Sequence, residues 1–416
     1  MKKRIILTAV LLLAAVSSAG AAELTLAECI ETAVKNHPDL AVSEARVDSA
    51  KAGISQAKAG AQPQVDLNSS YTRGNSPLED ETTRGNYNTG VTLSQLITDS
   101  GKTKLRIKKA QQTTDASKED LAEKRNEIVR SVSDAYYSLN STVRGCEVAQ
   151  TRYDNYAKRL DWANAYYKAG KKPKIEVTRA EADLASAKLA LITSKTDVQV
   201  ARAELASAMG DAQLKIESVR DELEYEDWNI SEDEAIKTAL AARPELIAKA
   251  KRVEAVKSEL GIQQKGMSPT VSLGGGYTLS GSAPADDKDW NARLTLSLPL
   301  TDGGATNSRI AQARADLKAA EAEQKSLQNA VVLEVRTAWQ SMIKAKESIV
   351  SAKEAERKEK ENHELAAKRY EAGVGNSLEI SDAVDSYALS QAKTILALYG
   401  GKSSQLTLLK AIGGRR

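Results

Sequence analysis

Residues 296–309 read "LSLPLTDGGATNSR", which begins like a β-strand and ends like the start of a helix. Apolar and polar side chains alternate up to Leu300, as expected for a strand with two different faces. The Thr-Asp-Gly-Gly segment that follows is typical of a turn that leads into a helix. A near copy, "LSQLITDSGKTKLR", occupies residues 93–106 and is identical at seven of the fourteen positions. The chain therefore makes the same strand-to-helix transition twice.

The duplication extends well beyond this transition. "IETAVKNHPDLAVSEARV" (30–47) matches "IKTALAARPELIAKAKRV" (236–253) at an offset of 206 residues. After the first strand of each copy the offset is 203 residues, as in "YYKAG" (166–170) against "RYEAG" (369–373). A fixed offset that holds along the chain indicates two tandem copies of one structural unit.

We therefore divide the chain after its N-terminal segment into a first repeat, residues 23–227, and a second repeat, residues 228–416. The change of offset by three residues falls between Thr72 and Asn86. Length differences concentrate in exposed loops, so a loop is predicted there.

Each repeat carries one predicted β-hairpin, at residues 63–97 in the first and 269–300 in the second. In the last strand Trp290, Leu294 and Leu296 lie on one face, while Arg293 and Thr295 lie on the other. A strand between lipid and water has this pattern. A half-buried sheet in a soluble protein has it too, so the alternation alone does not decide between them.

Four aromatic residues lie at the loop end of the two hairpins: Tyr71, Tyr87, Tyr277 and Trp290. Aromatic girdles at this level mark the membrane interface of outer-membrane barrels. Strands of about ten residues are also long enough to cross that membrane when tilted. We therefore interpret these four residues as lipid-interface aromatics.

A long helix is predicted after each transition, at residues 102–168 and 303–371, because neither segment contains a proline. About 65 helical residues span roughly 100 Å. Asp99 and Asp302 are the expected N-caps of these helices.

Shorter helices are predicted on both sides of each long helix. Return helices follow at 174–209 and 377–412, and helices precede the first strands at about 38–60 and 244–266. Placed end to end, one preceding and one returning helix have nearly the length of the long helix. They are expected to form a second column beside it.

The N-terminus has the composition of a secretory signal. Lys2, Lys3 and Arg4 precede an apolar run, and the small-residue stretch "SSAGAA" follows it. We assign residues 1–22 to a signal peptide, with a membrane anchor as the alternative. The apolar run is shorter than a membrane-spanning helix requires.

The remaining composition excludes several functions. Removal of the signal leaves 56 basic residues (59 − 3) against 56 acidic ones, which gives no support to nucleic-acid binding. The only cysteines, Cys29 and Cys146, and the only histidines, His37 and His363, are scattered along the chain. No metal site, cofactor or enzyme activity is therefore expected. The sequence leaves open whether the two cysteines are paired or free.

Four membrane-type strands per chain imply assembly. Sheet edges cannot stay open in lipid, and bacterial barrels have at least eight strands. Two chains give eight strands, whose lumen side chains fill, whereas three chains give twelve and room for a water-filled passage. The predicted fold is mainly α with a transmembrane β-barrel: a homotrimer with twelve strands and a long α-helical coiled-coil tunnel.

Over both repeats, the sequence resembles the TolC-like outer membrane efflux protein family. The resemblance rests on "AVKNHPDL" and "ALAARPEL", on "LPLTDGG", and on "RYEAGVGNSLEISDA", in the same order in both repeats. It implies an outer-membrane duct that extends into the periplasm as part of a tripartite efflux or type I secretion system. Such a duct works with a periplasmic adaptor (membrane fusion) protein and an inner-membrane pump. The cargo is not identified by the sequence.

The resemblance also implies roles for residues near the helical turns. Glu379 and Asp382 in the second repeat, and Glu176 in the first, match acidic residues that narrow the periplasmic aperture. Tyr167 and Tyr370 match an aromatic residue that helps to hold the aperture closed.

Other turn residues match positions that adaptors contact, namely Gly170, Gly373 and Val374. Arg179 stands where Asp382 would repeat, so the acidic ring is expected to be thinner in this chain. The alternative hypothesis is a soluble periplasmic coiled-coil adaptor or scaffold protein. It shares the signal and the long helices, but it requires neither the amphipathic strands nor the duplication.

Overall fold

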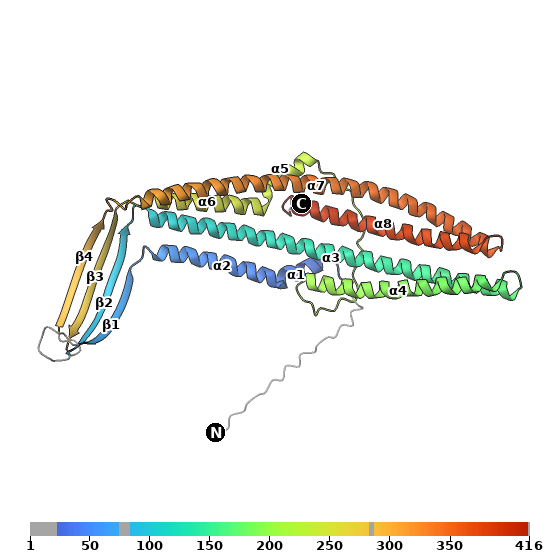
Figure 1. The fold of residues 1–416 in the computed structure, drawn as a ribbon, viewed down its shortest axis with the longest axis horizontal. Coiled ribbons are helices and arrows are strands. Elements are labelled where there is room, and N and C mark those ends of the chain that lie inside the picture. Colours follow the sequence, from blue (N-terminus) through green and yellow to red (C-terminus); the bar gives the residue numbers. More distant parts are fainter. Residues whose placement is uncertain (1–22, 75–83, 283–286, 415–416) are drawn as a thin grey trace, which may run out of the picture.

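The computed structural model describes residues 23–74, 84–282 and 287–414, and the predicted signal peptide lies outside them. Two helices of 67 residues, α3 (Lys102–Lys168) and α7 (Ala305–Glu371), run nearly the whole length of the molecule. A four-stranded sheet lies at one end of these helices, and two helical turns lie at the other (Figure 1).

The sheet is antiparallel with the order β1-β2-β3-β4. Its strands are β1 (Gln64–Gly74), β2 (Arg84–Thr98), β3 (Thr270–Gly281) and β4 (Asp287–Ser297). The first hairpin reaches past the predicted loop boundaries Thr72 and Asn86, to Gly74 and Arg84. Strand β4 ends three residues before the predicted Leu300, since Pro299 has no N–H for a sheet hydrogen bond.

The transition from strand to helix differs from the prediction in one detail. Gly101 and Gly304 occupy the N-cap positions, with left-handed φ angles of 86° and 88°. The predicted cap Asp99 acts from two residues further back, where its Oδ2 accepts hydrogen bonds of 2.7 Å from the backbone N–H and the hydroxyl of Thr103. Asp302 holds Thr306 in the same way, so the aspartates stabilise the first turn without being the N-cap residues.

The shorter helices form the second columns. In the first repeat α2 (Pro38–Ala59) and α4 (Lys174–Ala208) both pack on α3. In the second repeat α6 (Pro244–Gln264) and α8 (Ser377–Ala411) pack on α7. The two repeats meet where β2 pairs with β3 and where α3 packs against both α6 and α8.

The main core lies at the middle of the molecule, where the columns change from one helix to the next. Helices α1 (Leu26–Asn36) and α5 (Glu232–Ala242) lie there beside the long helices. The buried Tyr136 hydroxyl donates to the backbone oxygen of Arg220 at 2.7 Å and lies 3.2 Å from that of Leu24. This contact fixes the N-terminal segment to α3.

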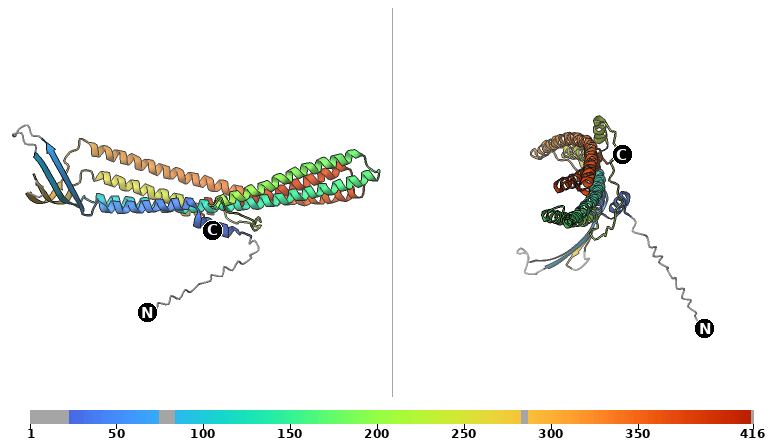
Figure 2. Two further views of the ribbon diagram at one scale, coloured as in Figure 1. Left: turned by 90° about the horizontal axis from the view of Figure 1, so that it is seen from below. Right: turned by 90° about the vertical axis from the view of Figure 1, so that its right-hand side faces the viewer.

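Both cysteines are free thiols in the structure. Cys29 is completely buried in the central core, and Cys146 is half-buried beside the same core. Figure 2 shows the molecule along its length and end-on, and in the end-on view the helices and the sheet follow an open arc. The edge strands of the sheet are β1 and β4.

Candidate functional site at the helical tips

The two turns opposite the sheet are built in the same way. After α3, Gly170 has a φ of 70°, and the N–H of Lys171 donates to the Tyr166 oxygen at 2.9 Å. After α7, Gly373 has a φ of 78°, and the N–H of Val374 donates to the Arg369 oxygen at 3.1 Å. A helix commonly ends with a residue in the left-handed conformation, after which the next backbone N–H donates to the carbonyl oxygen five residues earlier. Glycine adopts the left-handed conformation without strain.

The two matched tyrosines occupy different environments. Tyr370 is 1 % exposed, whereas Tyr167 is 45 % exposed. The Tyr370 ring packs against Trp162 and Tyr166, with centroid distances of 6.1 and 6.2 Å. The ammonium of Lys172 lies 5.0 Å from the centre of the same ring. We call α3 with α4 the first helical hairpin and α7 with α8 the second. Tyr370 therefore joins the two helical hairpins inside one chain, and Tyr167 does not.

The three predicted aperture carboxylates are not linked to one another by any hydrogen bond in the described residues. Glu379 pairs with Arg369 at 2.9 Å. Asp382 is exposed to solvent. Glu176 is half-buried near Tyr370: burial raises the pKa of Tyr370, and the Glu176 carboxylate raises it further against the opposing effect of Arg159.

A buried polar cluster that we did not predict lies behind these residues. Arg159 is 1 % exposed, and its Nη1 donates to Asp183 at 2.5 Å and to the Ser381 hydroxyl at 3.2 Å. Tyr156 extends the cluster, because its hydroxyl donates to Asp385 at 2.8 Å. These residues come from α3, α4 and α8, so the cluster connects the first hairpin to the second.

Sequence spacing contained a signal for this cluster. Arg152, Tyr156, Arg159, Ala163 and Tyr166 follow one another at intervals of three or four residues. Such residues share one face of a helix. An arginine between a tyrosine and an alanine on a core face indicates a buried charge that needs a partner.

Further hydrogen bonds cross between the hairpins at their ends. The Tyr166 hydroxyl lies 2.7 Å from the backbone oxygen of Glu371, and Lys172 donates to that of Gly375 at 3.2 Å. Arg152 pairs with Asp385 at 2.9 Å. The two hairpins of one chain are thus held together by apolar, polar and charged contacts.

At the opposite end, the four predicted interface aromatics form two cross-strand pairs, which lie four positions apart in the register because Tyr87 pairs with Gly281 and Tyr277 pairs with Val91. Tyr71 pairs with Tyr87 in the sheet register, and Tyr277 pairs with Trp290. The rings of Tyr71 and Tyr87 are 4.6 Å apart, and all four side chains are exposed.

Among the residues that the structure describes, none of the helices combines the length and the apolar character needed to cross a membrane. Within residues 23–74, 84–282 and 287–414, no three His, Cys, Asp or Glu side chains are grouped so that they could hold a metal ion.

A duplicated chain with an exposed amphipathic sheet at one end and paired helical hairpins at the other defines an outer-membrane channel of the efflux type. The outer membrane efflux protein family matches residues 29–211 and 235–414, one match in each repeat, and the chain belongs to this family. It is an outer-membrane channel that extends into the periplasm, and the channels of this family are transporters and not enzymes. The alternative of a soluble adaptor or scaffold is therefore set aside.

The chain is 25 % identical to outer membrane efflux protein BepC of Brucella suis over 357 residues, which cover 84 % of this chain and 76 % of BepC. It is 21 % identical to outer membrane protein TolC of Escherichia coli, with 99 % of this chain and 87 % of TolC covered. Among solved structures, CusC superposes with a TM-score of 0.84 at 17 % identity, covering 95 % of this chain and 93 % of CusC. The Campylobacter jejuni CmeC outer membrane channel superposes with a TM-score of 0.81 at 18 % identity, covering 94 % and 85 %. The match to the family confirms the predicted family, and the superpositions confirm the mainly helical fold with four strands per chain.

Proposed function

We propose that three copies of this chain form one duct, with a twelve-stranded barrel (three times four strands) continued by a helical tunnel. The observation that carries the proposal is the open sheet, whose edge strands β1 and β4 have no further strand beside them in the described residues. Backbone groups along such edges must be paired in lipid. Two chains would supply a barrel that side chains fill, whereas three would leave an aqueous passage.

The two faces of the sheet support this arrangement. On β4, Leu294 and Leu296 are largely exposed on one face, and the polar Arg293 and Thr295 alternate with them on the other. The apolar face would meet lipid and the polar face would line the passage. Tyr71, Tyr87, Tyr277 and Trp290 would then lie at the outer interface of the membrane.

At the helical tips we assign the periplasmic aperture. Tyr370 with its hairpin contacts would hold the tip together within each chain, while Tyr167, Glu176, Glu379 and Asp382 would border the passage. Three exposed or half-buried carboxylates per chain would place negative charge there and attract cations.

The partners of the duct are proposed from the family. A periplasmic adaptor would contact the turns at Gly170, Gly373 and Val374, and an inner-membrane pump would deliver the cargo through it. The turns suit such a contact, since Val374 is 73 % exposed at the end of the molecule.

Oligomeric mass and conductance test the duct. The mature chain is purified in detergent, its mass is measured by light scattering, and its conductance is recorded in planar lipid bilayers. A trimer with discrete conductance steps is the expected result. A monomer that conducts no ions would refute the proposal.

The aperture has a separate test. Glu379→Ala combined with Asp382→Ala should raise single-channel conductance or weaken block by divalent cations, because it removes charge from the aperture. Glu354→Ala, on the exposed face of α7 and far from the turn, serves as the control. Equal conductance and equal block in all three channels would remove Glu379 and Asp382 from the aperture.

A further inference from the structure

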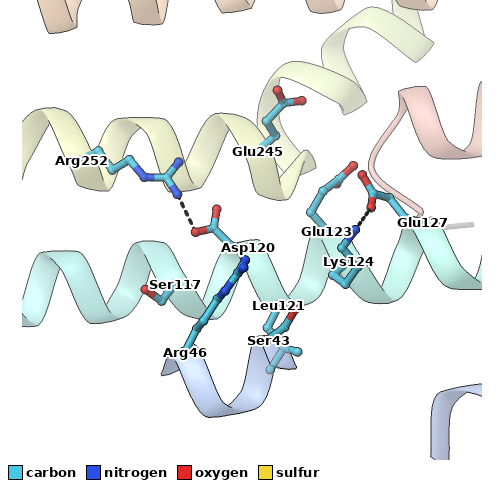
Figure 3. Close-up of a pocket in the computed structure, with 10 residues that line it drawn as sticks. All are labelled: Ser43, Arg46, Ser117, Asp120, Leu121, Glu123, Lys124, Glu127, Glu245 and Arg252. Atoms are coloured by element: carbon cyan, nitrogen blue, oxygen red, sulfur yellow. Dashed lines mark hydrogen bonds and ion pairs between the residues drawn. The ribbon is translucent and has the colours of Figure 1, made fainter. Parts of the chain in front are cut away.

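Charged side chains of both signs lie together along the helices. In a cavity of 340 Å³ between α2, α3 and α6, Arg252 donates to Asp120 at 2.5 Å and Lys124 donates to Glu127 at 2.5 Å (Figure 3). Opposite charges at this distance largely cancel each other's field, whereas a surface with charges of one sign attracts ions of the opposite sign. The apolar face of the sheet is such a surface.

The apolar residues of the four strands share one face of the sheet. Val91 of β2 pairs with Leu67 of β1 and with Tyr277 of β3, and Tyr277 pairs with Trp290 of β4. Residues two apart in a strand lie on the same face, so Leu294 belongs to this face as well. We call it the apolar face, and it is the face that would meet lipid in the proposed barrel.

Two charged residues lie on the apolar face of the described strands, and both are basic. Arg73 follows Tyr71 by two positions on β1, and Lys288 precedes Trp290 by two positions on β4. Each cation therefore shares the face of its aromatic neighbour. The acidic residues of the described strands lie on the other face: Asp66, Asp287 and Asp289. The strands thus separate cations at the lipid side from anions at the passage side.

In the first β-hairpin a tyrosine hydroxyl accompanies the cation. Arg73 pairs with Gly85, the next pair on this face towards the loop from Tyr71 and Tyr87. A Cβ atom on Gly85 would lie 2.5 Å from the Tyr71 hydroxyl, so the Tyr71 ring lies over Gly85 and its hydroxyl reaches the level of Arg73. Arg73 is exposed and forms no ion pair with the residues that the structure describes. Its guanidinium and the hydroxyl are both hydrogen-bond donors.

The second β-hairpin has a lysine at the same level. Lys288 pairs with Leu279, the next pair towards the loop from Tyr277 and Trp290. Lys288 is exposed, and within the described ranges it too forms no ion pair. The counterpart of Arg73 in the repeat is Leu279, at the offset of 206 residues. A cation therefore lies beyond the aromatic pair in both β-hairpins although different strands supply it.

In the proposed barrel these cations would lie among lipid headgroups. The helices leave the other end of the sheet and extend into the periplasm, so the loop ends of the β-hairpins lie towards the exterior (Figure 1). Aromatic girdles mark the boundary between the hydrocarbon and the headgroups. Two residues further along a strand is about 7 Å, which reaches the headgroup layer. The staggered register of tilted strands brings corresponding positions of the two β-hairpins to one height, although they are four positions apart in the sheet.

We propose that each β-hairpin binds a phosphate group of an outer-leaflet lipid, through Arg73 with the Tyr71 hydroxyl in the first and through Lys288 in the second. The inference rests on the proposed barrel, because it requires the apolar face to meet lipid. A guanidinium binds phosphate with two parallel hydrogen bonds, and an ammonium binds it as a point charge. Three chains would present six such cations (three times two) around the barrel. The acyl chains of the bound lipid would lie on Leu67 and Leu294, which are 70 % and 71 % exposed.

Lipid binding by the purified channel tests this inference. The protein in neutral detergent is incubated with lipid A, whose headgroup carries phosphate groups, and native mass spectrometry counts the lipids retained per trimer. The matched ligand is the same lipid after removal of its phosphates, with unchanged acyl chains. The wild type should retain lipid A and release the dephosphorylated lipid.

Three variants locate the site. Arg73→Gln with Lys288→Gln should weaken lipid A binding about tenfold or more, because hydrogen bonds to a charged phosphate are lost. Arg293→Gln is the matched control, since it removes a cation from the other face of β4, and it should bind lipid A like the wild type. Tyr71→Phe keeps the ring and removes the hydroxyl, so its binding should fall severalfold.

The outcomes separate this inference from the proposed duct. A trimeric double variant that binds lipid A as tightly as the wild type would refute the inference and leave the duct intact. Equal binding of the dephosphorylated lipid would refute it too, since apolar contacts alone would then hold the lipid. Loss of binding in Arg293→Gln but not in the double variant would show that the other face meets lipid, against both proposals. A wild-type chain that forms no trimer would overturn the duct and this inference together.

Vesicles test the same contact in a bilayer. Wild-type unfolding should require more denaturant in phosphatidylcholine vesicles that contain anionic phosphatidylglycerol than in pure phosphatidylcholine, because a ligand of the folded state stabilises it. High salt should reduce this difference, since the cations are exposed. The double variant should show a smaller difference than Arg293→Gln. Equal differences in these two variants would contradict lipid binding by Arg73 and Lys288.

Discussion

The guanidinium of Arg159 lies 2.5 Å from Asp183 and 3.2 Å from the Ser381 hydroxyl, with only 1 % of the arginine exposed. The three residues come from α3, α4 and α8, so one buried cation connects both hairpins of the chain. Two of its nitrogens, Nε and Nη2, have no hydrogen-bond partner among the described residues. The Asp183 carboxylate therefore provides the main compensation for the buried charge.

Asp183→Asn should destabilise the tip by about 3 kcal/mol, because it leaves an uncompensated buried charge. Hydrogen exchange of the α4 and α8 amides near the turns measures the effect locally. The double variant Arg159→Met with Asp183→Leu should be more stable than Asp183→Asn, since no buried charge remains. If the single variant exchanges like the wild type, Arg159 does not depend on Asp183.

Gly210, at the end of α4, should not tolerate a side chain. Its φ is 85°, and a Cβ atom would lie 2.9 Å from the Cα of His37. Gly210→Ala should therefore cost about 2 kcal/mol or more, from backbone strain and from displacement of the α1–α2 connection. Gly145 is the control, because it lies inside α3 with open space around it, and Gly145→Ala should stabilise by about 0.5–1 kcal/mol. Thermal unfolding in detergent measures both changes, and a similar loss in the two variants would contradict this reading of Gly210.

The sequence predicted the features that depend on local patterns. Period-two alternation located the strands, and the absence of proline located α3 and α7, because each signal lies within one element. The glycine N-caps at Gly101 and Gly304 were missed, since an aspartate two residues earlier accepts the hydrogen bonds from outside the N-cap position.

The tip was harder to predict, because the repeat makes its two halves look equivalent. Tyr167 and Tyr370 occupy matching positions, yet only Tyr370 is buried. The difference arises from tertiary contacts: Tyr370 faces Trp162 and Tyr166 across the hairpins, and the sequence alone does not state which hairpin face meets the other. Arg159 was detectable from its spacing, but its partners Asp183 and Ser381 lie on two other helices.

The two cysteines should differ in reactivity. Burial raises the pKa of the Cys29 thiol to about 11, with further contributions from Glu28 and Glu222. Its thiolate is therefore rare near neutral pH, and the thiolate is the reactive form. Maleimide should label the half-buried Cys146 in the folded protein and Cys29 only after unfolding. Mass spectrometry of Cys29→Ala and Cys146→Ser identifies the labelled site, and rapid labelling of folded Cys146→Ser would contradict the prediction.

His363 should make the tip less stable in mild acid. Its ring stacks on Tyr387 with centroids 5.4 Å apart, and burial lowers its pKa below 6.5, although Glu364 acts in the opposite direction. The unfolded chain therefore binds a proton before the folded chain does as pH falls through 6.5. Stability is lost from that point down to the folded pKa, below which no more is lost.

The measurement is the midpoint of denaturant unfolding between about pH 7.5 and about pH 5.5. The wild type should lose more stability over this range than His363→Gln, which lacks the titrating ring. His37→Gln controls for the other histidine. Parallel curves for the wild type and His363→Gln would show that His363 does not contribute.

Lysine substitutions on the two faces of β4 test which face meets lipid. Leu294 and Thr295 are neighbours in the second half of β4, and their side chains point to opposite faces of the sheet. Leu294→Lys should destabilise the membrane-inserted state by about 2–4 kcal/mol, because a charged group on the lipid face near the bilayer midplane loses its hydration. Thr295→Lys should have little effect on insertion, since its side chain would face the aqueous passage, but it should shift ion selectivity towards anions. Folding into lipid vesicles, followed by denaturant titration, measures insertion, and reversal potentials measure selectivity. If both lysines destabilise insertion equally, the two faces of the sheet do not separate lipid from water.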